Sequence, residues 1–321
     1  MAVYTRVSDE ALGAFLKNYD LGKARAFKGI AEGVENSNYY LETGQDRFIL
    51  TLFERRADPK DLPYFMAVKQ HLAARGFPCP APIADREGNV LRELEGRPAV
   101  IVSFLDGLSP NRPNTAQCRS MGEGLARMHN ALSDFEGQRE NALGPASWPS
   151  LWHGREATAD TLQHGLSELI EEDLGAIAAA KPQSLKIPRG TIHADLFPDN
   201  AFFIGETFSG AIDFYFACTD ALAYDLAVCI NSWAFEDGKE FNFSKGAALI
   251  SGYESVRPLE GAEREALPVL CRGAALRFFL TRLVDWTDTP DDALVRPKDP
   301  TDYAARLAVH RKARSAADYG A

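Results

Sequence analysis

Oxygen-bearing side chains gather in one stretch of the chain, His193-Ala-Asp-Leu-Phe-Pro-Asp-Asn200, which is followed by Ile212-Asp213-Phe214. Asp195 precedes Asn200 by five positions, and the expected strand-loop-hairpin context would let both point into one cleft with Asp213. Carboxylate and amide oxygens are hard ligands that suit Mg²⁺, which completes its shell with water and phosphate oxygens. The stretch therefore predicts magnesium-assisted chemistry on a phosphate.

Phosphoryl transfer to an alcohol needs a group that accepts or orients the hydroxyl proton, and oxygen ligands for the metal at the nucleotide phosphates. Asp195 is the candidate for the first role, and Asn200 and Asp213 are the candidates for the second. Taken singly, Asn200 could be a turn residue and Asp213 a helix cap. A hydrolytic metal site at His193 and Asp195 would need a third ligand, and no His or Cys follows at ligand spacing. The joint pattern favours a kinase.

The elements that must hold these residues fall into two parts. Residues 1–102 alternate in the manner of strands, with a first helix that begins after Ser8 and a second that we expect to open at Asp58-Pro59 and end before Gly76. The expected strands cover 23–30, 35–42, 47–54, 89–94 and 97–105. Nothing in this part repeats as a βαβ unit, so the prediction is a mostly antiparallel five-stranded sheet with one main helix.

After residue 107 the chain becomes largely helical. The fold class predicted is α+β with two lobes, a small N-lobe at 1–102 and a larger, mainly helical C-lobe at 108–321, with the boundary between them at 103–107. In the C-lobe we expect helices at 115–132, 156–180, 221–234, 244–255, 261–285 and 300–315, a strand at 190–193 and a hairpin over 201–214.

Composition narrows the class of protein. The chain has 321 residues, a net charge of −10 and 45% hydrophobic residues, which is ordinary for a globular protein. An acidic surface is a poor match for nucleic acid or an anionic membrane, so neither is an expected partner. The five cysteines form no CxxC pair and are expected to be reduced, buried thiols. With no apolar leader and no run long enough to span a membrane, we expect a cytoplasmic protein.

The motif HADLFPDN followed by IDF resembles the catalytic and metal loops of the aminoglycoside phosphotransferase and choline kinase superfamily, relatives of the protein kinases. The resemblance covers nearly the whole chain and implies a bilobal, protein-kinase-like fold with a hinge at 103–107. It implies that ATP is the phosphoryl donor, that Asp195 is the catalytic base, and that Asn200 and Asp213 bind Mg²⁺. It also implies a helix after the metal loop, in which Asp225 is expected to be a structural residue.

The sequence departs from this superfamily where the nucleotide phosphates should bind. Superfamily members usually place Lys or Arg on the strand that here carries Thr51, and no glutamate stands at the expected place in the following helix to pair with such a residue. Other groups must therefore neutralise the negative charge of the nucleotide phosphates. The candidates are Lys28, Arg55, Arg56 and the backbone of the 29–38 loop with its glycines Gly29 and Gly33. By resemblance, the hinge backbone from Ser103 to Leu105 is expected to hold the adenine.

Longer phrases, among them GVENSNY, FILTLFERR, IDFYFACTDALAYDLA and LRFFLTRLVDW, resemble the bacterial homoserine kinases of the aminoglycoside-phosphotransferase-like type. This implies L-homoserine as the small-molecule substrate, on the route to threonine. A carboxylate needs a cation, and Arg277 and Arg282 lie in an apolar helix where a guanidinium could bind it in a bidentate manner. Each could equally pair with an acid of its own lobe. The remaining substrate candidates are Asp199, Tyr215 and Asp220.

Two other interpretations stay open on the sequence alone. A related kinase could act on choline or ethanolamine, methylthioribose or an aminoglycoside, with an aromatic cage formed by Trp233, Tyr215 and Phe235, although such a cluster is more often core. A catalytically silent nucleotide-binding module is the third hypothesis, prompted by Thr51, and the intact Asp195, Asn200 and Asp213 count against it.

Overall fold

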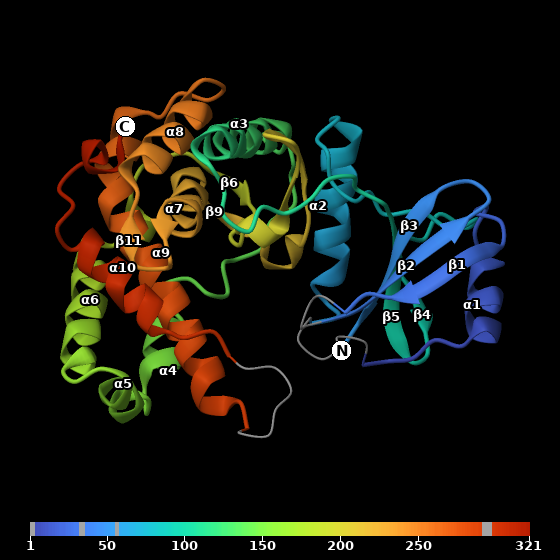
Figure 1. Ribbon diagram of the computed structural model, residues 1–321, viewed down its shortest axis with the longest axis horizontal. Coiled ribbons are helices and arrows are strands. Elements are labelled where there is room, and N and C mark those ends of the chain that lie inside the picture. The colour runs from blue at the N-terminus through green and yellow to red at the C-terminus, as the bar shows by residue number, and fades with distance from the viewer. Residues whose placement is uncertain (1–3, 32–35, 55–57, 291–296) are drawn as a thin grey trace. The chain divides into compact units, whose positions relative to one another are not determined.

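The computed structural model describes residues 4–31, 36–54, 58–290 and 297–321, and within it the chain divides into two units (Figure 1). The first unit consists of Met1–Gly107, Phe135–Gly137 and Ser209–Tyr215. The second unit consists of Leu108–Asp134, Gln138–Phe208 and Phe216–Ala321. Asp213 therefore belongs to the first unit, whereas Asp195 and Asn200 belong to the second.

The first unit is built on a five-stranded sheet in the order β1-β2-β3-β5-β4. Every neighbouring pair is antiparallel, which confirms the predicted α+β class and its five-stranded antiparallel sheet. Leu50 and Leu52 of β3 are fully buried on one face of this sheet, and Thr51 lies on the other. The strands are β1 (Ala24–Gly29), β2 (Asn36–Thr43), β3 (Arg47–Phe53), β4 (Arg92–Leu94) and β5 (Arg97–Ser103).

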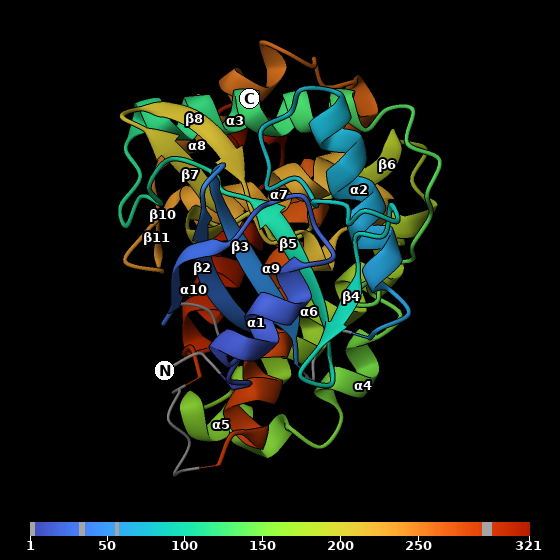
Figure 2. The ribbon, with the colours of Figure 1, turned by 90° about the vertical axis from the view of Figure 1, so that its right-hand side faces the viewer.

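Each face of the sheet has a helix of its own. Helix α1 (Asp9–Leu16) begins where the Ser8 hydroxyl accepts a hydrogen bond from the Ala11 amide, and Figure 2 shows it lying across the sheet. Its apolar side chains share a core with Leu50 and Leu52. Helix α2 (Leu62–Ala74) contributes Phe65 to the face that carries Thr51. The two helices therefore cover opposite faces of the sheet, as Figure 1 shows.

Helix α2 begins three residues later than the sequence predicts. Asp58 opens a turn instead: its carbonyl accepts from the Asp61 amide at 2.9 Å, and its carboxylate accepts from the Lys60 amide at 3.0 Å. Asp61 is the N-cap, and Pro63 takes the early helical position that suits a proline because no backbone donor is needed there. The prediction of one helix over 156–180 was also wrong. Two helices, 156–162 and 166–180, occupy this stretch, and Gly165 between them adopts a left-handed φ of 76°.

The second unit is mainly helical, as predicted. Its helices are α3 (Thr115–Ala131), α4 (Trp148–Trp152), α5 (Glu156–Leu162), α6 (Leu166–Ala180), α7 (Leu222–Trp233), α8 (Phe243–Glu254), α9 (Gly261–Asp288) and α10 (Thr301–His310). Short strands pair as β6 (Arg189–Ile192) with β9 (Cys218–Ala221) and β10 (Phe235–Glu236) with β11 (Glu240–Phe241). A further pair is formed by β7 (Ala201–Ile204) and β8 (Thr207–Ala211), and the last three residues of β8 belong to the first unit. Sequence analysis missed α4, β9, β10 and β11, which are too short to carry a periodic pattern.

Helices α3 and α8 approach to backbone contact, and two glycines make this possible. A Cβ at Gly122 would lie 2.0 Å from the Leu249 carbonyl oxygen, and one at Gly252 would lie 2.0 Å from the Arg119 carbonyl oxygen.

All five cysteines are free and buried, which confirms the expectation of reduced thiols. Across the described ranges, no helix combines the length and the apolar character needed to traverse a bilayer.

Candidate active site

The loop that carries Asp195 runs from the end of β6 to the 3₁₀ turn Pro198–Asn200, just before β7. Its backbone is unusual at Ala194, whose φ of 63° lies in the left-handed region that a residue with a Cβ rarely adopts. Such a conformation costs of order 1 kcal/mol and persists only where the surroundings hold it. The loop is therefore held in place by other parts of the second unit.

Asp225 on α7 holds this loop. Its carboxylate accepts hydrogen bonds from the backbone amides of His193 and Ala194, both at 2.8 Å, and a third contact joins it to His129 Nε2 at 3.2 Å. Burial alone would raise the pKa of Asp225, but His129 and His193 offset it and place the pKa below the ordinary value. The carboxylate thus stays charged in the interior and fixes the two peptides that precede Asp195.

A second set of contacts from α7 holds the other side of the loop. Trp233 Nε1 donates to the Leu196 carbonyl at 2.9 Å, and the Ser232 hydroxyl donates to the same oxygen at 3.4 Å. His193 faces inward, where its Nδ1 accepts from the Asp195 amide at 3.3 Å. In the described part of the chain, no group of three or more His, Cys, Asp or Glu side chains is placed to hold a metal ion.

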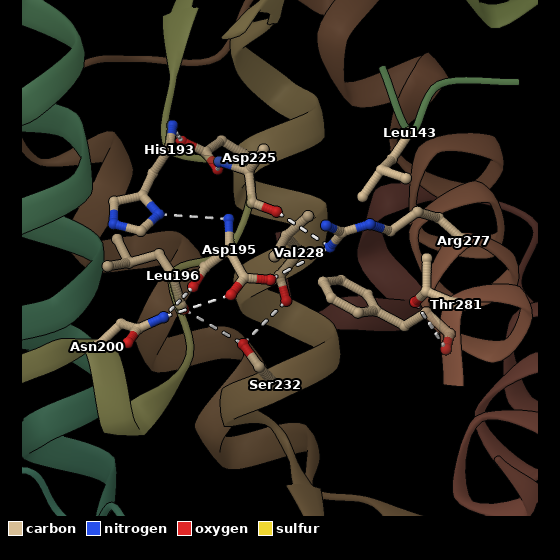
Figure 3. A network of polar contacts seen from close by, with 12 residues as sticks. Leu143, His193, Asp195, Leu196, Asn200, Asp225, Val228, Ser232, Arg277 and Thr281 are labelled. Carbon is tan, nitrogen blue, oxygen red and sulfur yellow. Dashed lines mark hydrogen bonds and ion pairs between the residues drawn. The ribbon is translucent and has the colours of Figure 1, made fainter. Parts of the chain in front are cut away.

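Asp195 lies between two of the predicted site residues, as Figure 3 shows. Arg277 Nη1 on α9 contacts Asp195 Oδ1 at 3.3 Å and the Ala194 carbonyl at 3.2 Å. On the other side, Asn200 Nδ2 donates to the Asp195 carbonyl at 2.8 Å and lies 3.4 Å from Asp195 Oδ2. Because the amide nitrogen of Asn200 faces Asp195, its amide oxygen points away and is the atom suited to a metal.

The Asp195 carboxylate is partly shielded, with its side chain 21% exposed. Burial raises its pKa above the ordinary value, and the positive charge of the nearby Arg277 acts in the opposite direction. A carboxylate that is harder to ionise is a stronger proton acceptor once ionised. This arrangement suits a base that receives a proton from an alcohol.

Asp213 follows β8 in the first unit and, like Ala194, has a left-handed backbone, with φ 62°. The next residue but one, Tyr215, packs edge-on against Phe53 and Phe65, with ring centroids 5.1 and 5.8 Å away. Its hydroxyl is hydrogen-bonded to Thr51, and burial raises its pKa far above the ordinary value. Tyr215 is thus a packed, neutral side chain on the sheet face that carries Thr51.

Lys69, which was not predicted from the sequence, lies in this part of the first unit. It stands on the apolar side of α2 and is only 4% exposed. Its ammonium lies 5.6 Å from the centre of the Tyr215 ring and is attracted by Asp213. Burial lowers its pKa to about 8. A charged residue among Leu62, Phe65 and Leu72 was the available signal, because lysine is rarely buried without a role.

Several other predicted residues have partners of their own. Arg282 contacts Asp302 at 3.4 Å and donates to the Asp299 carbonyl at 2.9 Å, so it connects α9 to the start of α10. The Asp220 carboxylate pairs with Arg189 at 2.9 Å and accepts from Asn141 at 2.8 Å. For Arg282 these contacts favour the alternative left open on the sequence, a structural pairing within its lobe, and Asp220 is likewise paired with residues of the second unit.

Asp199 differs from these two, because its side chain is 68% exposed and lies 3.8 Å from Lys298.

In the proposed aromatic cage, Trp233 and Phe235 are core residues. Trp233 donates a hydrogen bond to the Leu196 carbonyl, and Phe235 packs on Phe241 and Arg306. The structure therefore gives no support to a cage for a quaternary ammonium from this pair.

The predicted nucleotide contacts lie in the first unit. Lys28 and Gly29 are exposed on the outer strand β1, and Gly33, Arg55 and Arg56 fall outside the described residues.

In the hinge, the Ser103 amide donates to the Ala81 carbonyl at 2.9 Å and the Phe104 amide donates to the Arg47 carbonyl at 3.2 Å. Because those two amides are engaged, the Leu105 backbone is the better candidate of the predicted pair for an adenine contact.

Comparison with known proteins places this arrangement in a family. The model of the phosphotransferase enzyme family matches residues 26–259, a stretch that includes Asp195, Asn200, Asp213 and Asp225. The chain belongs to this family. Curated relatives of this phosphotransferase include the homoserine kinase of Hyphomonas neptunium, 68% identical over 328 residues, and that of Acidiphilium cryptum, 57% identical over 320 residues. Both alignments cover 100% of this chain and 100% of the relative.

Solved structures agree on the fold of this phosphotransferase. An amicoumacin kinase superposes with a TM-score of 0.67 at 16% identity, over 95% of this chain and 92% of the other. The choline kinase of Cryptosporidium parvum gives a TM-score of 0.62 at 14% identity, over 95% of each chain. These likenesses confirm the predicted kinase-like fold, and at such identities they carry no information on substrate.

Proposed function

We propose that this phosphotransferase is a homoserine kinase, which transfers the γ-phosphoryl group of ATP to the side-chain hydroxyl of L-homoserine. The observation that carries the proposal is identity of 68% over the full length of a curated homoserine kinase, with further homoserine kinases at 53–57%.

Asp195 is the proposed catalytic base. Its carboxylate accepts or orients the proton of the homoserine hydroxyl while the oxygen attacks the γ-phosphorus, and ADP leaves. Support comes from the rigid loop beneath it, fixed by Asp225, and from the burial that raises its pKa. Proton acceptance by a positioned carboxylate contributes on the order of 10²- to 10⁴-fold in rate.

Asn200 and Asp213 are the proposed ligands of Mg²⁺. The Asn200 amide fits this role because its nitrogen is engaged by Asp195 and its oxygen is turned away. Two oxygen ligands from protein suit Mg²⁺, which takes the rest of its shell from phosphates and water. When bound, the ion would neutralise charge on the phosphate oxygens.

Arg277 is the proposed partner of the homoserine carboxylate. It is 4% exposed, its guanidinium stacks 3.8 Å from the Phe278 ring, and it already faces Asp195. A substrate whose hydroxyl approaches Asp195 would bring its carboxylate into the neighbourhood of this cation. A guanidinium presents several donors in one plane, so Arg277 can keep its contact with Asp195 and still bind the substrate carboxylate.

A coupled assay of ADP release tests the proposal, with homoserine, choline, ethanolamine, methylthioribose and an aminoglycoside as acceptors. We expect turnover with homoserine and a loss of 10²-fold or more, by order of magnitude, in the variant Asp195→Asn. Asp288→Asn, an exposed aspartate that pairs with Arg155, is the matched control and should keep the wild-type rate. Choline turning over while homoserine does not, or an Asp195→Asn enzyme as fast as wild type, would contradict the assignment.

A further inference from the structure

The strand position where superfamily members usually carry a phosphate-binding cation is occupied by a neutral and fully engaged side chain. Thr51 is 4% exposed, its hydroxyl donates to Asn38 Oδ1 at 2.8 Å, and it is also hydrogen-bonded to Tyr215. Thr51 therefore has no charge to offer and little freedom to move. A triphosphate still requires positive charge beside its oxygens, because charge builds on them during transfer.

Lys69 brings a positive charge to the same part of the first unit from a different element. Thr51 is bonded to Tyr215, and the Lys69 ammonium lies over the ring of that tyrosine at 5.6 Å. Asp213, two positions before Tyr215, attracts the same ammonium. Strand β3, helix α2 and the segment after β8 thus bring Thr51, Lys69 and Asp213 around one tyrosine.

The burial of Lys69 is hard to explain by packing alone. A lysine on a helix can usually extend its stem and keep its ammonium in water, yet Lys69 is 4% exposed and lies on the apolar side of α2. Its backbone carbonyl accepts from the Cys79 thiol at 3.6 Å, which fixes the helix at this point. Leucine or methionine would fill the space without taking a charge out of water.

The chain holds a second buried lysine that shows what a structural one looks like. Lys245 on α8 is 8% exposed, and its ammonium forms a 2.6 Å ion pair with Glu236. The charge of Lys245 is thereby neutralised within the fold. The carboxylate whose charge acts on the Lys69 ammonium is that of Asp213, which is itself a proposed magnesium ligand. Lys69 is thus influenced by a residue that is proposed to act at the phosphates, and Lys245 is not.

We propose that Lys69, on helix α2, supplies the phosphate-directed cation that Thr51 on strand β3 cannot, so that the cation has moved from the strand to the helix that faces it. The ammonium contacts the nucleotide phosphates beside Asp213. Its position is fixed by the ring of Tyr215, which is in turn hydrogen-bonded to Thr51. This role rests on the proposed function, because it assumes that a nucleotide is the phosphoryl donor.

Nucleotide binding by the full chain tests this role without any acceptor substrate. Titration calorimetry with MgADP and with adenosine compares ligands that differ only in the phosphates and their metal, for wild type, Lys69→Met and Lys69→Gln. We expect both variants to lose roughly 10- to 100-fold in affinity for MgADP, the effect of one charged donor, and to bind adenosine within about threefold of wild type. Lys245→Met is the matched control, which should lower the unfolding temperature and leave MgADP affinity unchanged.

Two outcomes would overturn the assignment. MgADP affinity within about threefold of wild type in both variants would show that Lys69 does not contact phosphate. Equal losses for adenosine and MgADP would show that the substitutions merely distort the first unit. Using two variants guards against a single one that fails to fold. Because no homoserine is present, these results stand apart from the acceptor assay: an enzyme that phosphorylates homoserine yet tolerates Lys69→Met in MgADP binding refutes this role alone.

Discussion

The substitution Asp225→Asn tests whether one buried carboxylate holds the loop that carries Asp195, the proposed catalytic base. Asp225 is 0% exposed and accepts from two backbone amides at 2.8 Å and from His129 at 3.2 Å. An asparagine of the same shape has one acceptor oxygen, so one of the two amides would face an NH₂ group. Removing a charged partner and leaving a buried donor unsatisfied costs about 3–5 kcal/mol of unfolding free energy.

The same substitution should also slow catalysis. The left-handed Ala194 is held by the bond from its own amide to Asp225, and Asp195 is the next residue. Once that bond is lost, the peptide can relax and displace the Asp195 carboxylate. A displacement of about 1 Å at a reacting group can reduce the rate by about 10²-fold, and we expect kcat to fall by that order.

Three measurements decide this prediction: chemical denaturation for the free energy, steady-state kinetics for kcat, and hydrogen exchange at the amides of His193 and Ala194. The matched control is Asp173→Asn. Asp173 is also 0% exposed, and it binds Arg272 at 2.6 Å and Arg311 at 2.5 Å, partners on α9 and just after α10 rather than on the loop.

The control variant should lose comparable stability and keep its kcat at temperatures where it stays folded. The reasoning is refuted if Asp225→Asn leaves amide exchange unchanged, or if Asp173→Asn lowers kcat equally.

Two further predictions concern substrate recognition and pH. The variant Arg277→Gln should raise the KM for homoserine about 10-fold or more while changing the KM for MgATP far less, because it removes the proposed carboxylate partner; equal changes in both constants would count against that role. His310 is buried between Asn231 and Tyr319, and burial with the charges of Arg306 and Arg272 lowers its pKa to about 3. The unfolded chain binds this proton below about pH 6.5, whereas the folded chain does not. The free energy of unfolding should therefore decrease as the pH is lowered, by about 2 kcal/mol between pH 7 and pH 5. Denaturation at pH 7 and pH 5 should show a smaller fall in His310→Gln, and identical falls would rule out His310 as the source.

The sequence alone determined the features that depend on neighbours along the chain. The start of α1 at Ser8, the alternation of β3 and the spacing of Asp195 and Asn200 are local patterns, set by capping, by burial on one face of a sheet and by the length of a loop. Helix breaks were less certain. Gly165 can sit within a helix or end one, and only packing decides which.

The tertiary structure decided which distant residues meet. Asp225 stands 31 positions from Ala194 and Arg277 stands 82 from Asp195, and no spacing rule connects residues so far apart. Lys69 is the sharpest case, because on the sequence it is one lysine in an amphipathic helix and Thr51 appears as a missing charge. The fold places both around Tyr215, so a charge absent from one element is supplied by another. The charge required beside a phosphate is a property of the site and not of any single chain position, so contacts across the fold determine which residue carries it.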